Sequence, residues 1–149
     1  MLIDVKVKVA RIVDNKIKKI TTTFVLDREF FSQAEYTITQ LLQNEQRQGT
    51  VDDYSIVSLK MSSIKEIADQ YGGGEHNYII TLKDIFHADD GTEKYVRYKV
   101  LLWANNLIEA NQRANQMSHE GYDMQIEGIK QVDYEYLSQE ENEQGSADE

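Results

Sequence analysis

The stretch FVLDREFFSQAEYTITQLL, residues 24–42, decides the fold, because it has a counterpart in VLLWANNLIEANQRANQM, residues 100–117. In both stretches a short apolar run leads through polar residues into a segment whose apolar residues lie three and four positions apart. The apolar run is typical of a buried strand, and the spaced pattern is typical of an amphipathic helix. A strand that leads directly into a helix therefore occurs twice in the chain.

The segments around these stretches also match. Residues 53–60, DYSIVSLK, and residues 123–130, DMQIEGIK, both have apolar residues at their fourth and seventh positions. A hairpin precedes each helix, with turn-forming residues at Asp14–Lys16 and at Asp89–Gly91. Each half of the chain is therefore predicted to form two strands, a helix and a closing strand.

This duplication predicts the domain organisation. We expect a first ββαβ repeat over residues 1–62, a linker over 63–74, a second repeat over 75–137 and a disordered acidic tail over 138–149. Residues 64–71 are expected to form a short helical turn, and the glycines at 72–74 a flexible joint.

The fold class that follows is α+β. We expect a tandem ββαβ repeat that forms a mostly antiparallel six-stranded sheet with two helices on one face. A right-handed crossover is expected to place each closing strand parallel to the strand before the helix. Two separate three-stranded sheets packed with pseudo-symmetry remain an alternative.

Residue types at the helix ends and along the helix faces refine this prediction. Ser32 with Glu35 has the spacing of a capping box for the first helix, and Asn105 or Asn106 can cap the second. The spacing of apolar residues predicts the two core-facing stripes. These stripes are Phe31, Ala34, Ile38, Leu41 and Leu42 in the first helix, and Leu107, Ala110, Ala114 and Met117 in the second.

Composition excludes several classes of protein. The chain has no cysteine, which removes disulfides, thiolate nucleophiles and cysteine-ligated metal sites. No segment approaches the about 20 consecutive apolar residues that a membrane-spanning helix needs. No secretory signal pattern is present at the N-terminus. We therefore expect a cytoplasmic protein that does not contact a membrane.

Charge is unevenly distributed along the chain. The net charge is −10, yet residues 1–23 hold six cations against two carboxylates, which is +4, so the remaining 126 residues carry −14. The last twelve residues hold five acids and no base. A basic first hairpin and an acidic tail are therefore the two charged features that a function has to explain.

The duplicated ββαβ pattern, the segment from Phe24 to Glu35 and the closing residues 54–60 together resemble an uncharacterised family of proteins of about this length from Bacteroidetes bacteria and their phages. The resemblance covers nearly the whole chain. It implies a bacterial or phage intracellular protein and brings no known active site.

No residue pattern predicts catalysis, a cofactor or a metal site. Ser32 is explained as a helix cap, and adjacent carboxylates in a turn rarely act together on one substrate as acid and base. His87 lies near acidic residues, but the spacing is not that of a calcium loop. We therefore predict no catalytic and no metal-binding residues.

The sheet face that the helices leave open is the candidate binding surface. Cations interleaved with aromatics suit single-stranded nucleic acid, which offers phosphates and base faces. The predicted contact residues are Lys6, Lys8, Lys19, Lys83, Tyr95, Arg97, Lys99 and Trp103. A solvated polar face is the ordinary alternative, because any one-sided sheet has one.

Two functions of different classes follow. The first is a non-enzymatic binder of single-stranded nucleic acid that works beside the replication or recombination proteins of a bacterium or phage. The second is an acidic protein-interaction module, such as a phage-encoded inhibitor of a host protein, which the net charge of −10 favours. Single-stranded nucleic acid or a host or phage protein is the expected partner. The sequence predicts no oligomeric state.

Overall fold

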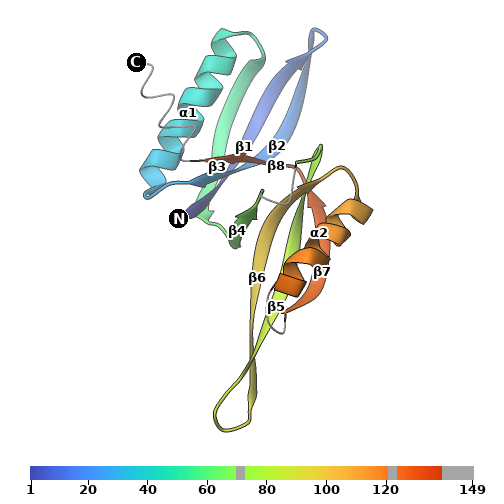
Figure 1. The fold of residues 1–149 in the computed structure, drawn as a ribbon. Coiled ribbons are helices and arrows are strands. Elements are labelled where there is room, and N and C mark those ends of the chain that lie inside the picture. Colours follow the sequence, from blue (N-terminus) through green and yellow to red (C-terminus); the bar gives the residue numbers. More distant parts are fainter. Residues whose placement is uncertain (70–72, 121–123, 139–149) are drawn as a thin grey trace. The chain divides into compact units, whose positions relative to one another are not determined.

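A computed structural model describes residues 1–69, 73–120 and 124–138. The chain forms two compact units (Figure 1). The first joins Met1–Ser62 to the segment that begins at Tyr134, and the second is Ser63–Asp133. No helix in the described part of the chain is long and apolar enough to span a membrane.

The first unit contains four strands and one helix. Its elements are β1 (Leu2–Val13), β2 (Lys16–Asp27), α1 (Phe31–Arg47), β3 (Val51–Met61) and β8 (Tyr134–Leu137). The strand order is β3-β1-β2-β8. β3 and β2 both lie antiparallel to β1, so they run parallel to each other, as predicted, but β1 lies between them. β8 is parallel to β2.

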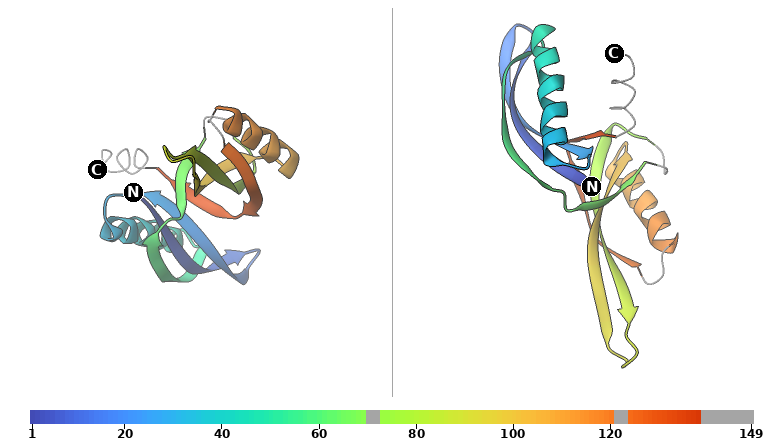
Figure 2. Two further views of the ribbon diagram at one scale, coloured as in Figure 1. Left: turned by 90° about the horizontal axis from the view of Figure 1, so that it is seen from below. Right: turned by 90° about the vertical axis from the view of Figure 1, so that its left-hand side faces the viewer.

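The second unit has the same arrangement. Its elements are β4 (Ile64–Ala68), β5 (His76–His87), β6 (Glu93–Ala104), α2 (Leu107–Glu120) and β7 (Met124–Val132). The strand order is β4-β6-β5-β7, and β4 is parallel to β6. The two views of Figure 2 show that each helix lies along one face of its own strands and leaves the other face open.

The α+β class is confirmed, but the single six-stranded sheet is wrong, because the chain forms two sheets of four strands. Each helix buries its apolar stripe against its own sheet. Ala34, Ile38 and Leu42 of α1 pack in a core with β1 residues such as Val5 and Val7. α2 forms a second core with β5 and β6. Two separate cores hold two separate sheets together.

The fourth strand of each sheet is the strand that follows the closing strand of the other repeat in the chain. β4 follows β3 in the chain but pairs with β6, while β8 follows β7 but pairs with β2. The expected helical turn at 64–71 is therefore wrong over Ile64–Ala68, which forms a strand. The second repeat, expected over 75–137, is divided at Asp133, because β7 before it and β8 after it belong to different sheets.

The two exchanged strands are equivalent. Lys99 and Thr23 occupy corresponding positions in β6 and β2, and they pair with Ile64 and Tyr134, the first residues of β4 and β8. The last residues correspond as well. Ala68 is buried in the second core, and Leu137 packs against the first.

A β-bulge provides further evidence for the duplication. Between β1 and β3 the register shifts at Lys6/Val7, which leaves Val57 as the extra residue. Between β5 and β7 it shifts at Thr81/Leu82, which leaves Glu127 as the extra residue. Both bulges lie at the same place in the repeat, so the two halves share irregular as well as regular features.

The helix starts differ from the prediction. α1 begins at Phe31 with Phe30 as its N-cap residue, and the Gln33 side chain accepts hydrogen bonds from the backbone N–H groups of Glu29 and Phe30. Ser32 therefore does not cap the helix. In α2 the predicted cap is confirmed, because the Asn106 side chain accepts a hydrogen bond from the Glu109 N–H at 2.8 Å.

Two residues assigned to the helical core stripes are exposed. Phe31 and Leu107 are both first residues of their helices, and 43% and 57% of their surfaces are accessible. The first turn of each helix extends past the edge of its core, so its apolar residues are not covered. The remaining stripe residues are buried or pack against the cores.

Of the three glycines expected to form a joint, Gly72 lies outside the described residues, while Gly74 has a specific packing role. A Cβ atom built on Gly74 would overlap the backbone of Ala104, whereas a Cβ on Gly73 meets nothing within 4 Å. Close approach of two backbones therefore requires glycine at position 74.

We predict that Gly74→Ala lowers the free energy of unfolding by about 1–3 kcal/mol, because the added methyl forces the backbone at Ala104 to move. Gly73→Ala is the matched control and should have a much smaller effect. Urea denaturation of both variants measures the difference. Equal stability of the two variants would contradict the close packing at Gly74.

We also predict opposite outcomes for two truncations. Removing residues 138–149 leaves β8 intact, so the melting temperature should barely change. Removing residues 134–149 also takes away β8 and the core contact of Leu137. That contact alone is worth about 2 kcal/mol, or about 4–8 °C in melting temperature. Similar melting temperatures by calorimetry would show that β8 does not stabilise the first sheet.

Candidate functional site

Alternation along β1 separates the core of the first unit from its open face. Val5, Val7 and Val9 are buried beneath α1, while Lys6 and Lys8 between them are exposed. Successive side chains in a strand point to opposite faces, so the two lysines belong to the open face. The sequence pattern predicted this placement correctly.

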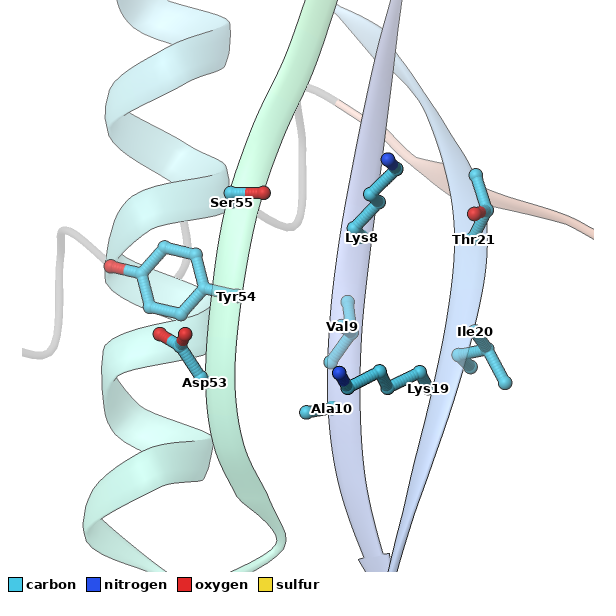
Figure 3. Close-up of a pocket in the computed structure, with 9 residues that line it drawn as sticks. All are labelled: Lys8, Val9, Ala10, Lys19, Ile20, Thr21, Asp53, Tyr54 and Ser55. Atoms are coloured by element: carbon cyan, nitrogen blue, oxygen red, sulfur yellow. The ribbon is translucent and has the colours of Figure 1, made fainter.

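Ala10 creates a hollow in this open face. It lies opposite Lys19 of β2 and Asp53 of β3, and its methyl group is much shorter than the side chains on either side. The adjacent row across the three strands is Ser55, Lys8 and Thr21. Together these residues surround a hollow of about 420 Å³ (Figure 3).

The hollow combines two amines, two hydroxyls and one carboxylate. The amines of Lys8 and Lys19 and the hydroxyls of Thr21 and Ser55 can donate hydrogen bonds to an anion. Among the residues that the structure describes, no carboxylate lies within ion-pair distance of Lys6, Lys8 or Lys19. The first sheet therefore presents three cations whose charge no ion pair within the described chain neutralises.

An aromatic residue that was absent from the predicted set lies on the same face. Lys6, Thr23 and Tyr134 form one row across β1, β2 and β8, so their side chains share the open face. Tyr134 is partly buried, and this burial, together with the negative charge of Asp4, raises the pKa of its phenol. The sequence offered no signal for this position, because β8 joins the first sheet from the other end of the chain.

The open face of the second sheet has a different composition. Lys83 of β5 lies directly opposite Arg97 of β6. The Tyr95 ring contacts both cations, with the Lys83 Nζ atom 4.2 Å and the Arg97 Cζ atom 4.7 Å from the ring centroid. These cation–π contacts occupy the aromatic surface that we predicted would stack on a base.

Arg97 has a second partner. Its Nε–H donates to the Glu127 carboxylate at 2.7 Å, and Glu127 is the extra residue of the β7 bulge. This hydrogen bond lowers the pKa of Glu127 and raises that of Arg97. Arg97 is therefore already paired within the unit, which sequence reasoning did not foresee.

Lys99 and Trp103 lie farther along β6. Lys99 is opposite Thr81 and is partly buried, because β4 begins to pair with β6 at this residue. Trp103 is also partly buried, opposite Asn77. The eight predicted contact residues do not share the face of one sheet, since three belong to the first sheet and five to the second.

The acidic residues near His87 lie in the turn between β5 and β6. The described residues contain no group of three or more His, Asp or Glu side chains that could hold a metal ion. Near His87, the Asp90 carboxylate accepts hydrogen bonds from the Thr92 hydroxyl at 2.5 Å and the Thr92 N–H at 3.0 Å, and these bonds lower its pKa. Asp90 thus stabilises the hairpin turn.

The fold and its faces define a duplicated α+β protein with two open sheet surfaces. The family of a domain of unknown function, DUF4494, matches residues 1–138. The chain therefore belongs to this family. No curated protein and no solved structure matches the chain.

We predict that Arg97→Gln raises the pKa of Glu127 towards its ordinary value, because the charged hydrogen bond is lost. NMR titration of the side-chain carboxyl carbon measures this shift. Lys94→Gln, on the opposite face of β6, is the control and should leave the titration unchanged.

The lowered pKa of Glu127 determines how the stability of the fold changes with pH. The Arg97–Glu127 pair stabilises the fold above the unfolded-state pKa of Glu127, and this contribution is lost as pH falls through the lower folded-state pKa. Because both side chains are well exposed, the change in stability is small. An unchanged Glu127 titration in Arg97→Gln would contradict the pairing.

Proposed function

We propose that the protein is a non-enzymatic binder of single-stranded nucleic acid and that the open face of the first sheet is its contact surface. The setting that we propose is bacterial or phage replication or recombination. The observation that supports the proposal is the hollow over Ala10, which is flanked by Lys8 and Lys19, neither of which forms an ion pair with another described residue.

The hollow has the chemistry of a phosphate contact. Lys8 and Lys19 supply positive charge, and Thr21 and Ser55 supply hydroxyl donors from the neighbouring strands. Hydrogen bonds and charge directed at phosphate position a nucleic acid strand without reading its sequence. Asp53 at the rim repels phosphate but can accept a hydrogen bond from a sugar hydroxyl or a base amine.

Lys6 and Tyr134 extend this surface along the sheet. They lie in one row with Thr23, so a cation and an aromatic side chain border the same path. Single-strand binders combine a positively charged groove with aromatic side chains on which bases stack. The second sheet offers Lys83, Tyr95 and Lys99 as a separate patch, in which the Tyr95 ring already contacts Lys83.

The charge distribution favours this region as the contact surface. The first 23 residues carry +4, while the remainder of the chain carries −14 and repels a polyanion. A strand can therefore approach the first hairpin and is disfavoured elsewhere. The same net charge supports the second function, an acidic module that binds a basic surface of another protein.

We predict that a fluorescent oligonucleotide binds at low salt and that its affinity falls steeply as salt rises, because counterions are released from the phosphates. Lys8→Glu and Lys19→Glu should each weaken binding to all sequences and reduce the salt dependence by about one ion. Fluorescence anisotropy across a salt series measures both quantities.

The adjacent residue Lys18 provides a matched control for Lys19. Lys18 lies on the other face of β2, so Lys18→Glu makes the same change in net charge away from the hollow. It should weaken binding much less than Lys19→Glu. Ala10→Leu fills the hollow without changing charge and should weaken binding. Equal effects of the two lysine variants, or no binding at low salt, would reject the proposed face and favour the protein-interaction function.

A further inference from the structure

The outer half of β6 is an open sheet edge. β4 pairs with β6 only from Lys99 to Leu102, and β5 lies on the other side of β6. Among the described residues, no strand pairs with Glu93–Tyr98 on the β4 side. Figure 1 shows this part of the β5–β6 hairpin extending beyond β7, whose pairing with β5 ends at Asp84.

The backbone of this edge is ready for hydrogen bonding. The Ala88 N–H donates to the Thr92 carbonyl at 2.8 Å, so the backbone groups of Thr92 point towards β5. Because backbone groups alternate in direction along a strand, the N–H and C=O groups of Glu93, Tyr95 and Arg97 point to the open edge. Such an edge is a template for an added strand.

The corresponding edge in the first unit is protected. β8 covers β2 only from Thr23 to Leu26, and no other strand in the described ranges pairs with Lys16–Thr22 on that side. This stretch contains three lysines, and lysines on an edge oppose the pairing of like edges. The outer half of β6 instead carries both signs of charge, with Tyr95 and Val96 51% and 53% exposed.

We propose that two copies of the chain pair antiparallel through the outer halves of β6, with the two-fold axis at Tyr95. Tyr95 of each copy then faces Tyr95 of the other. Glu93 of each copy faces Arg97 of the other, so opposite charges meet on both sides of the axis. The two four-stranded sheets become one continuous sheet of eight strands, joined through an isologous interface.

Charge and steric access select this register. Hydrogen bonding requires the two-fold axis to pass through a residue. An axis at Lys94 or at Arg97 places like charges directly opposite each other, which is destabilising. A two-fold axis at Val96 places Glu93 of one copy opposite Lys99 of the other. β4 already pairs with β6 at Lys99, so a second strand cannot pair there. The axis at Tyr95 avoids both conflicts.

The existing pairing of Arg97 does not prevent the interaction. Its Nε–H is bonded to Glu127, and the remaining donors of the guanidinium are available for Glu93 of the second copy. The cation–π contacts of Tyr95 lie on the sheet face, while the added strand lies at the sheet edge.

Cysteine cross-linking tests the register, because the natural chain has no cysteine. Facing residues in a hydrogen-bonded pair have Cα atoms about 5.5 Å apart, which suits a disulfide. Tyr95→Cys should therefore give a disulfide-linked dimer under mild oxidation. Lys19→Cys, at the equivalent position of β2, should stay monomeric. Cross-linking of Val96→Cys in preference to Tyr95→Cys, or equal cross-linking of Lys19→Cys, would overturn the proposal.

Sedimentation of the full chain tests the association without oxidation. The mass should rise from monomer to dimer with increasing concentration. Tyr95→Lys places two lysines together at the axis and should remain monomeric, with an unchanged circular dichroism spectrum because Tyr95 is exposed. Ile17→Lys adds the same charge to the open edge of β2 and should dimerise normally. A monomeric natural chain at every soluble concentration, or a dimeric Tyr95→Lys, would reject the interface.

Discussion

Each sheet of this protein is completed by a strand that the other repeat carries. β4 and β8 cover the inner halves of β6 and β2, and Ala68 and Leu137 bring apolar side chains to the cores beneath α2 and α1. The chain therefore passes between the two units before β4 and again before β8, although each unit has its own core and its own helix.

This constraint also shapes how the chain folds. The hairpins β1–β2 and β5–β6 close through short turns, and such local contacts form quickly. The pairing of β8 with β2 joins Tyr134 to Thr23, residues that lie far apart in the sequence. Contacts between residues so distant in sequence slow folding, because the entropy of loop closure is lost before the contact forms.

Local pattern was sufficient to predict the repeats, the first hairpin and the faces of its lysines. Asp14 and Asn15 adopt positive φ angles in the turn that their residue types predicted. β4 was not predictable in this way, because Ile64–Ala68 contains lysine, glutamate and alanine, which favour helix. Its strand conformation comes from pairing with β6. Burial at the helix starts likewise depends on where each core ends.

The same limit explains the site. Alternation predicted that Lys6, Lys8 and Lys19 are exposed on one face, but the hollow depends on the short side chain of Ala10 in the register of three strands. The pairing of Arg97 depends on a bulge that turns Glu127 towards it. Neither register nor bulge is visible in the composition of a single strand.

The strand exchange has a consequence for how two related halves can come to differ. In a single copy of the repeat, the same pairing would require the exchange of its last strand with a second molecule. Fusion of two copies makes the strand exchange intramolecular. The high effective concentration of each strand then removes the need for two molecules to associate. Once joined, the halves are free to diverge. One edge carries three lysines, and the other carries exposed Tyr95 and Val96 beside charges of both signs.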